Sequence, residues 1–159
     1  MKKILLAACI FCLAGMMTNQ AEAQVRFGGG VAYGFDIEEI AISANALVGL
    51  NEKLAIQPSF NYYFVGEGVT FWELNGDLHY SLTGSETLDL YALGGISIVR
   101  TAIEAVIFGV PFSVSDTVIG LNLGVGANFG SGGNITPFGE LKYTVGDASQ
   151  LVLSAGIRF

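Results

Sequence analysis

The sequence predicts an all-β fold, a transmembrane, eight-stranded, antiparallel up-and-down β-barrel. First, most of the chain divides into segments of roughly 9–13 residues in which apolar and small or polar side chains alternate. Second, mean hydropathy is high, at +0.56, yet the later chain lacks the roughly 18 consecutive apolar residues of a transmembrane helix. Third, the less apolar faces are rich in glycine, serine and asparagine, which suits the narrow interior of a small barrel.

Eight alternating segments follow one another along the chain. A tilted strand needs about 9–11 residues to cross a bilayer. A soluble sandwich or lipocalin-like barrel is the alternative fold, but strands in soluble proteins are usually about 5–6 residues long. The predicted strands are 25–35, 40–50, 54–64, 70–82, 88–100, 117–129, 135–145 and 151–159.

The first four segments alternate clearly. In 25–35 large apolar residues are separated by Arg26 and small residues, and in 40–50 aliphatic residues are separated by Ser, Asn and Gly. In the next two segments the second face is more polar. The residues of the apolar faces are Val25, Phe27, Val31, Tyr33, Phe35, Ile40, Ile42, Ala44, Ala46, Val48, Leu50, Leu54, Ile56, Pro58, Phe60, Tyr62, Phe64, Trp72, Leu74, Leu78, Tyr80 and Leu82.

The second four segments repeat this scheme. In 88–100 the polar face is interrupted by Leu93 and Val99, and in 117–129 aliphatic residues alternate with glycine and asparagine. The last two segments carry charged side chains on the second face. The residues of the apolar faces are Leu88, Leu90, Ala92, Ile96, Ile98, Ile119, Leu121, Leu123, Val125, Phe129, Ile135, Leu141, Tyr143, Val145, Leu151, Leu153, Ile157 and Phe159.

Aromatic residues lie near the segment ends on the apolar faces. Transmembrane barrels carry such aromatic girdles at both membrane–water boundaries. The predicted girdle residues are Tyr33, Phe35, Tyr62, Phe64, Trp72, Tyr80, Phe129, Tyr143 and Phe159.

The connections indicate a topology with both termini in the periplasm. Periplasmic turns are short in such barrels, whereas external connections are longer. Only one connection in this chain, 101–116, is long. The predicted inner turns are 51–53, 83–87 and 130–134, and the outer connections are 36–39, 65–69, 101–116 and 146–150.

The first residues have the pattern of a Sec-type signal peptide. Lys2 and Lys3 precede a short apolar stretch, and the small residues Ala21 and Ala23 occupy the positions that matter for cleavage. We expect cleavage before Gln24.

This division leaves 1–23 as the signal peptide and 24–159 as the barrel. Cys9 and Cys12 both lie in the removed part. The alternative is a lipoprotein signal with Cys9 as the lipidated residue. The apolar stretch before Cys9 would then hold about five residues, against the roughly 7–15 that a signal needs.

The mature chain is acidic. It keeps 5 Lys and Arg against 13 Asp and Glu, a net charge of −8. Nucleic-acid binding is excluded as a function class, because neutralising phosphates requires basic side chains. The mature chain has no cysteine, and it shows no zinc, dinucleotide or phosphate-loop spacing. The sequence therefore predicts no cofactor, no metal and no catalytic residue.

The range 24–159 resembles the small eight-stranded outer-membrane barrels of the OmpX and OmpA-transmembrane-domain type. The likeness rests on the eight alternating segments, on the segment Pro137–Glu140 through Tyr143, and on the terminal segment 151–159. It implies a bacterial outer-membrane protein surrounded by lipid and lipopolysaccharide. In that family the barrel assembly machinery reads a last strand that ends in an aromatic residue, here Phe159. We expect a monomer.

Charged residues of both signs fall on the predicted inward face. The resemblance to OmpA implies that they form an ion-pair network filling a lumen just wide enough for side chains, since buried charges need partners. The alternative is a pore lining or a proton path. The predicted network comprises Arg26, Glu73, Asp77, Asp89, Glu140, Lys142 and Arg158.

His79 is the only histidine of the chain. His79-Tyr80-Ser81 resembles the His-x-Ser element of the lipid A deacylase barrels, which implies a hydrolase. In that family Asn-Ala follows this element, whereas Leu82 and Thr83 follow it here. The predicted topology also places His79 near the periplasmic end and pointing inward, away from the outer leaflet. We expect an interior histidine and no enzymatic activity.

Two kinds of charged residue fall near the predicted outer end. Arg100 lies on the outward face, where it either extends toward lipopolysaccharide phosphates or is solvated in a loop. The acidic side chains of the outer loops either bind divalent cations or solvate the loops. They are Asp36, Glu38, Glu39, Glu67, Glu104, Asp116 and Asp147.

The connection 101–116 is apolar where a surface loop is normally polar. An exposed apolar segment often marks a contact surface, although the segment could also fold over the barrel mouth. Thr101 to Glu104 and Pro111 to Asp116 could instead continue the flanking strands into a protruding hairpin that turns near Phe108-Gly109. The predicted contact residues are Val106, Ile107, Phe108, Val110 and Phe112.

Unpaired strand edges of such a hairpin could add a strand from a partner protein. This resembles the protruding sheet of the OmpX barrels, which implies surface interaction. The sequence therefore predicts a non-enzymatic barrel with a side-chain-filled interior that serves envelope structure or surface interaction. The alternative is a narrow pore or a carrier for small hydrophobic molecules.

Overall fold

The computed structural model describes residues 25–85, 87–107, 110–130 and 134–159. The predicted signal peptide lies outside these residues. Within them the structure has no helix that is long and apolar enough to cross a membrane. The strands are β1 (Val25–Gly34), β2 (Glu39–Gly49), β3 (Leu54–Tyr63), β4 (Val69–Ser81), β5 (Leu88–Ile107), β6 (Val110–Phe129), β7 (Thr136–Gly146) and β8 (Gln150–Arg158).

The eight strands form one closed barrel. Each strand pairs antiparallel with the next, and β1 pairs with β8 from Gly28↔Arg158 to Gly34↔Val152. Reciprocal backbone hydrogen bonds of 3.0 and 2.8 Å between Phe27 and Phe159 extend this closure to the last residue. The predicted fold class, an eight-stranded antiparallel transmembrane barrel, is confirmed.

The outer surface is apolar around the barrel. On β6 the odd-numbered residues point outward, so that Ile119 is 70% exposed and Leu123 62%, while Asn122 between them is 1% exposed. This reverses the distribution of a soluble protein and suits a surface that faces lipid. The period-two pattern read from the sequence therefore separates the lipid face from the lumen face correctly.

The lumen face carries mostly polar side chains, together with glycines that leave room for the larger ones. Tyr91 is only 2% exposed and lies opposite Gly126 in the β5–β6 register. A Cβ atom at position 126 would come within 2.4 Å of the Tyr91 ring. Glycine is therefore needed at this position so that a large ring can lie across the interior.

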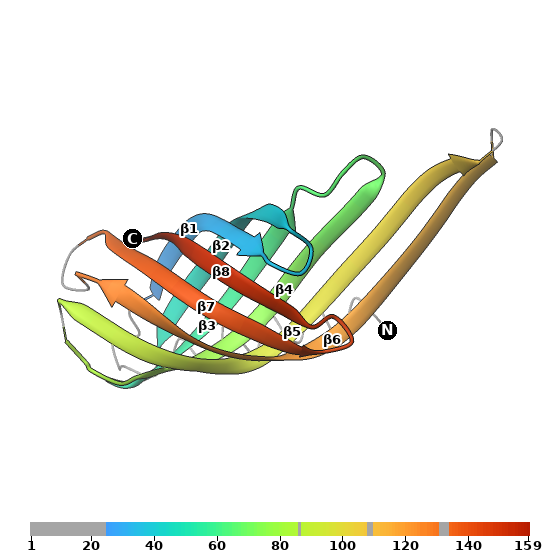
Figure 1. The fold of residues 1–159 in the computed structure, drawn as a ribbon. Coiled ribbons are helices and arrows are strands. Elements are labelled where there is room, and N and C mark those ends of the chain that lie inside the picture. Colours follow the sequence, from blue (N-terminus) through green and yellow to red (C-terminus); the bar gives the residue numbers. More distant parts are fainter. Residues whose placement is uncertain (1–24, 86, 108–109, 131–133) are drawn as a thin grey trace, which may run out of the picture.

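The two ends of the barrel differ. The end with the C-terminus carries the short connections β2–β3, β4–β5 and β6–β7, and we call it the C-terminal end. At the opposite end β5 and β6 run far beyond the other strands as a two-stranded hairpin (Figure 1). We call this the hairpin end. There the lumen holds a small apolar cluster of Ala32, Ala41, Tyr63 and Val152, with Phe71 packed against it.

Strand boundaries agree with the sequence prediction to within one or two residues, except in β5 and β6. The outer connection 101–116 is strand on both sides, as the protruding-hairpin prediction for this segment expected, since β5 continues to Ile107 and β6 starts at Val110. The turn predicted at 108–109 lies outside the described residues. Each strand has 20 residues, and at about 3.3 Å per residue each extends over about 65 Å.

Candidate functional site

Arg158 is the centre of the polar interior near the C-terminal end. Its side chain is fully buried at 0% exposure. Nη2 donates to Glu140 Oε1 at 2.6 Å and to Gln57 Oε1 at 2.5 Å, and Nε donates to Asn45 Oδ1 at 3.3 Å. Nη1 donates to Asn128, and the guanidinium lies 3.9 Å from the ring centroid of Phe138. A buried guanidinium is thus bound by several polar partners and one aromatic face.

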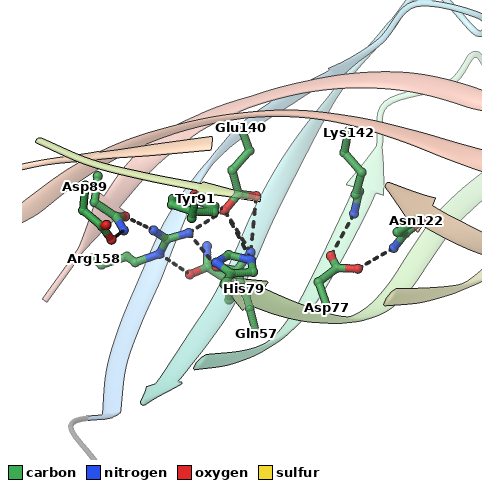
Figure 2. A network of polar contacts seen from close by, with 11 residues as sticks. Gln57, Asp77, His79, Asp89, Tyr91, Asn122, Glu140, Lys142 and Arg158 are labelled. Carbon is green, nitrogen blue, oxygen red and sulfur yellow. Dashed lines mark hydrogen bonds and ion pairs between the residues drawn. The ribbon is translucent and has the colours of Figure 1, made fainter. Parts of the chain in front are cut away.

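Glu140 compensates this charge and gathers further donors. Besides Arg158, it accepts the hydroxyl of Tyr91 at 2.7 Å and the amide of Gln57 at 3.1 and 3.3 Å. The residues that meet here come from β3, β5, β7 and β8 (Figure 2). Glu140 therefore links strands on different sides of the barrel.

A second ion pair lies further along the lumen (Figure 2). Lys142 Nζ is 3.4 Å from Asp77 Oδ2, and Asp77 Oδ1 accepts the amide of Asn122 at 2.8 Å. Asn122 also donates to Asn75 at 3.0 Å and accepts the hydroxyl of Thr144 at 2.9 Å. Both charges of this pair are buried.

The other three charged residues of the predicted network each form hydrogen bonds with neutral side chains. Glu73 accepts the amide of Asn61 at 3.1 Å. Asp89 accepts the Ser81 hydroxyl at 2.5 Å and the Asn128 amide at 3.3 Å. Arg26 donates to the hydroxyl of Thr136 at 3.0 Å. The structure therefore places all seven side chains on the lumen side and joins four of them in two ion pairs.

His79 is buried in the same region and is stacked on Tyr91, with ring centroids 4.4 Å apart. Its Nε2 lies 4.0 Å from Glu140 Oε1, beyond hydrogen-bond distance. A serine nucleophile needs a base within hydrogen-bond reach, but the Ser81 hydroxyl donates to Asp89 instead. The His-x-Ser element therefore does not form a nucleophile–base pair here.

A cavity of about 100 Å³ opens beside this region at the C-terminal end. Its lining includes His79, Ser81, Asp89, Tyr91 and Asn128. Among the described residues, no three His, Cys, Asp or Glu side chains gather as a metal site requires. The cavity is too small for more than a few water-sized groups.

The hairpin of β5 and β6 is the second candidate site. β4 follows β5 only as far as Val69↔Ile103, and β7 follows β6 only as far as Gly120↔Gly146. β5 and β6 themselves stay paired to Ile107↔Val110. Within the described chain, residues 110–119 of β6 therefore have a strand on one side only.

The free edge of β6 can be identified atom by atom. The backbone of Leu90 and Glu104 on β5 bonds toward β4, so the odd-numbered residues of β5 bond to β6. Because alternate residues of an antiparallel strand bond to opposite sides, the odd-numbered residues of β6 direct their backbone groups to the free edge. Pro111 has no N–H to offer there, and the Thr117 N–H is bound by Asp116 Oδ1 at 2.9 Å. The N–H groups of Ser113 and Ser115 remain directed at the open edge.

The polarity of the two sheet faces exchanges where β5 and β6 leave the barrel. In the barrel the outward face is apolar, but in the hairpin it carries Glu104, Ser113 and Ser115. The face that continues the lumen side becomes apolar. It includes Ile103, Val110, Phe112 and Val114, which are 47–64% exposed. Lipid therefore no longer surrounds the hairpin beyond this exchange.

The predicted contact residues are only partly described. Val110 and Phe112 are exposed on the apolar face of the hairpin. The backbones of Val106 and Ile107 belong to β5, and Phe108 lies outside the described residues. Sequence reasoning missed Ile103 and Val114, which face each other in the register. Counting back along both strands from a turn at 108–109 would have found them.

Sequence reasoning also missed several neutral groups of the interior. Gln57, Asn122 and Asn128 are polar residues on the inward face, and all are buried and bound to charged partners. Phe138 lies inside the barrel, under Arg158. Phe138 lies two residues before Glu140 and therefore on the same, inward face of the strand, which could have been read from the sequence.

Known structures share this fold. No protein-family model and no curated protein matches the sequence. The N-terminal β-barrel domain of Pseudomonas aeruginosa OprF is similar with a TM-score of 0.68 and 14% identity, covering 85% of this chain and 95% of that chain.

Two further barrels are similar over nearly their whole length. Ail, the attachment invasion locus protein of Yersinia pestis, gives a TM-score of 0.58 and 18% identity, covering 87% of this chain and 100% of that chain. Neisserial surface protein A gives 0.60 and 16%, covering 84% and 92%. The chain therefore has the fold of the small eight-stranded outer-membrane β-barrels.

Proposed function

We propose that the chain is a non-enzymatic barrel of the bacterial outer membrane that binds an extended protein segment at the free edge of β6. The observation that carries this proposal is the hairpin, whose residues 110–119 have a strand on one side only among the described residues. An open strand edge offers main-chain groups to an added strand. The barrel would present this edge above the membrane.

The surroundings of the edge favour a basic partner. Exposed carboxylates at the hairpin end include Asp36, Glu67, Glu104, Asp116 and Asp147. Arg100 is the one basic side chain in the outer connections and the hairpin, counted over the described residues. Electrostatic complementarity therefore selects an extended segment that carries Lys or Arg. The exposed apolar face beside the edge adds contact area for alternate apolar side chains.

The interior supports binding rather than transport. Arg158, Gln57 and Tyr91 are at most 2% exposed and occupy the lumen near the C-terminal end, and the apolar cluster around Tyr63 fills the other end. The neighbours are consistent with this role, since one of them carries an attachment function in its name. The last strand and Phe159 are proposed to act as the assembly signal that the family resemblance implies.

The test uses one substitution on the free edge. Ser113→Pro removes an edge N–H, and β5 does not use this N–H because odd-numbered β6 residues bond away from it. Pro111, two residues away, shows that the edge accepts proline. The probe is a labelled nine-residue peptide that alternates lysine and valine. We expect the intact barrel to bind it, and Ser113→Pro to weaken binding about tenfold, since both a donor and the docking geometry are lost.

Two controls make this result specific. Ser113→Thr keeps the N–H and should bind like the parent. A peptide that alternates glutamate and valine should bind more weakly than the lysine peptide. Equal binding of both peptides, or no effect of Ser113→Pro, would contradict recognition at this edge.

A further inference from the structure

The outward face at the base of the hairpin carries an isolated cation. Arg100 lies in the register row Trp72↔Arg100↔Thr117, which runs across β4, β5 and β6. One step below, on the same face, are the apolar residues Ile98 and Ile119. Arg100 therefore lies at the level where the apolar belt ends, beside an aromatic residue of the predicted girdle.

Among the described residues, the guanidinium of Arg100 contacts hydroxyls and forms no ion pair with a carboxylate. Nη1 is 3.5 Å from Thr117 Oγ1, and Nη2 is 3.4 Å from Ser115 Oγ. No carboxylate of the described chain is recorded within 4.0 Å of it. Asp116 is next to Thr117 in sequence but belongs to the opposite face of the hairpin. The positive charge thus stays uncompensated although the surrounding hairpin end is acidic.

This arrangement fits an oxyanion. A guanidinium offers a planar fork of N–H donors that matches phosphate oxygens. The hydroxyls of Ser115 and Thr117 accept from Arg100, so their own protons are free to point outward. All three side chains are exposed on the outward face of the sheet, and none lies on the face that continues the lumen.

We propose that Arg100, Ser115 and Thr117 bind a phosphate group of the outer-leaflet glycolipid, the phosphorylated lipid A of lipopolysaccharide. The position of the row directly above the apolar belt selects a headgroup whose acyl chains cover that belt. This proposal rests on the proposed outer-membrane location, but not on strand addition at the β6 edge. The contact would also fix the depth of the barrel in the outer leaflet.

The test measures lipid binding by native mass spectrometry of the purified barrel in neutral detergent at low salt. Bisphosphorylated lipid A is compared with chemically dephosphorylated lipid A. We expect preferential binding of the phosphorylated form, and Arg100→Gln to weaken it about fivefold, the effect of one basic side chain near an anionic surface. Arg100→Lys keeps the charge without the planar fork and should lose less.

Lys53→Gln is the matched control, because it removes an exposed cation from a turn at the opposite end of the barrel. It should leave lipid A binding unchanged. Unchanged binding in Arg100→Gln, or equal binding of both lipid A forms by the parent barrel, would overturn the proposal. Competition by millimolar inorganic phosphate would overturn the lipid as the ligand and indicate a free-anion site.

A deletion separates this proposal from the proposed function. Removing residues 104–113 takes away residues 110–113 of the free β6 edge, including Ser113, but leaves Arg100, Ser115 and Thr117 in the chain. The deletion variant should no longer bind the lysine peptide. It should still bind phosphorylated lipid A in preference to the dephosphorylated form. If the variant loses both peptide binding and the preference for phosphorylated lipid A, the lipid site depends on the deleted part of the hairpin. That result would contradict a site formed by Arg100, Ser115 and Thr117 alone.

Discussion

At the scale of single residues, the interior depends most on Glu140. It is the one carboxylate within ion-pair distance of Arg158 in the described chain, and it also accepts from Tyr91 and Gln57. Removing a carboxylate from a buried pair leaves the cation uncompensated, which costs more than the pair itself contributes. The replacement of one side chain here affects strands on opposite sides of the barrel.

We expect Glu140→Ala to lower the free energy of unfolding by about 3–5 kcal/mol, because it leaves Arg158 buried without a counter-charge. Tyr91→Phe, which removes one hydrogen bond to the same carboxylate, should cost only about 1.5–3 kcal/mol. Urea titration in phospholipid vesicles measures both, with the fluorescence of Trp72, the only tryptophan, as the signal. A Glu140→Ala barrel as stable as the parent would contradict this ranking.

Gly126 tests the packing of the same region. A Cβ atom there would meet the Tyr91 ring at 2.4 Å, so Gly126→Ala should destabilise the barrel by about 1–3 kcal/mol through overpacking. The double variant with Tyr91→Ala removes the clash and should be more stable than the sum of the two single effects implies. Additive effects would show that the two positions do not compete for space.

At the scale of elements, the alternating pattern was enough to find all eight strands. A period of two is a strong signal when one face meets lipid and the other a narrow lumen, as on β6 with Ile119 and Asn122. The same parity placed Glu140, Lys142 and Arg158 inside. It could not pair them, since Lys142 contacts Asp77 across the barrel, and such contacts depend on side-chain length and strand tilt.

The alternating pattern of the membrane face ended the fifth strand at residue 100 and began the sixth at residue 117, and only the hairpin hypothesis for 101–116 extended them. Above the apolar belt the outward face carries Glu104 and Ser113 instead of aliphatic residues, so the expected pattern breaks off. The alternation itself continues with the faces exchanged. A sequence analysis that allows the apolar and polar faces to exchange at the membrane boundary would predict both strands up to Ile107 and Val110.

The hairpin should be dispensable for folding. Deleting residues 104–113 removes no residue that pairs with β7 and ends β5 where β4 leaves it. We expect the variant to keep the gel-mobility difference between unheated and heated samples that closed barrels show, and a β-type circular dichroism spectrum. A barrel that no longer forms would show that the hairpin is part of the core and would weaken its assignment to surface contact.

At the scale of the whole molecule, buried side chains occupy the lumen at more than one level. The apolar cluster around Tyr63 lies at the hairpin end, the Lys142–Asp77 pair lies further along, and Arg158 with its partners lies near the C-terminal end. An eight-stranded barrel is only just wide enough for the side chains that fill it. A continuous water path would require several of these groups to move together.

We therefore expect planar-bilayer recordings of the purified protein to show no large, stable conductance. Tyr63→Ala, which opens the apolar cluster alone, should also remain silent, because both ion pairs still obstruct the lumen. Glu140→Ala combined with Tyr63→Ala weakens two levels and should give brief, irregular openings at most, with the Lys142–Asp77 pair left in place. A steady conductance of the unmodified barrel would instead favour the transport function over surface binding, and conduction in Tyr63→Ala alone would identify the apolar cluster as the only barrier.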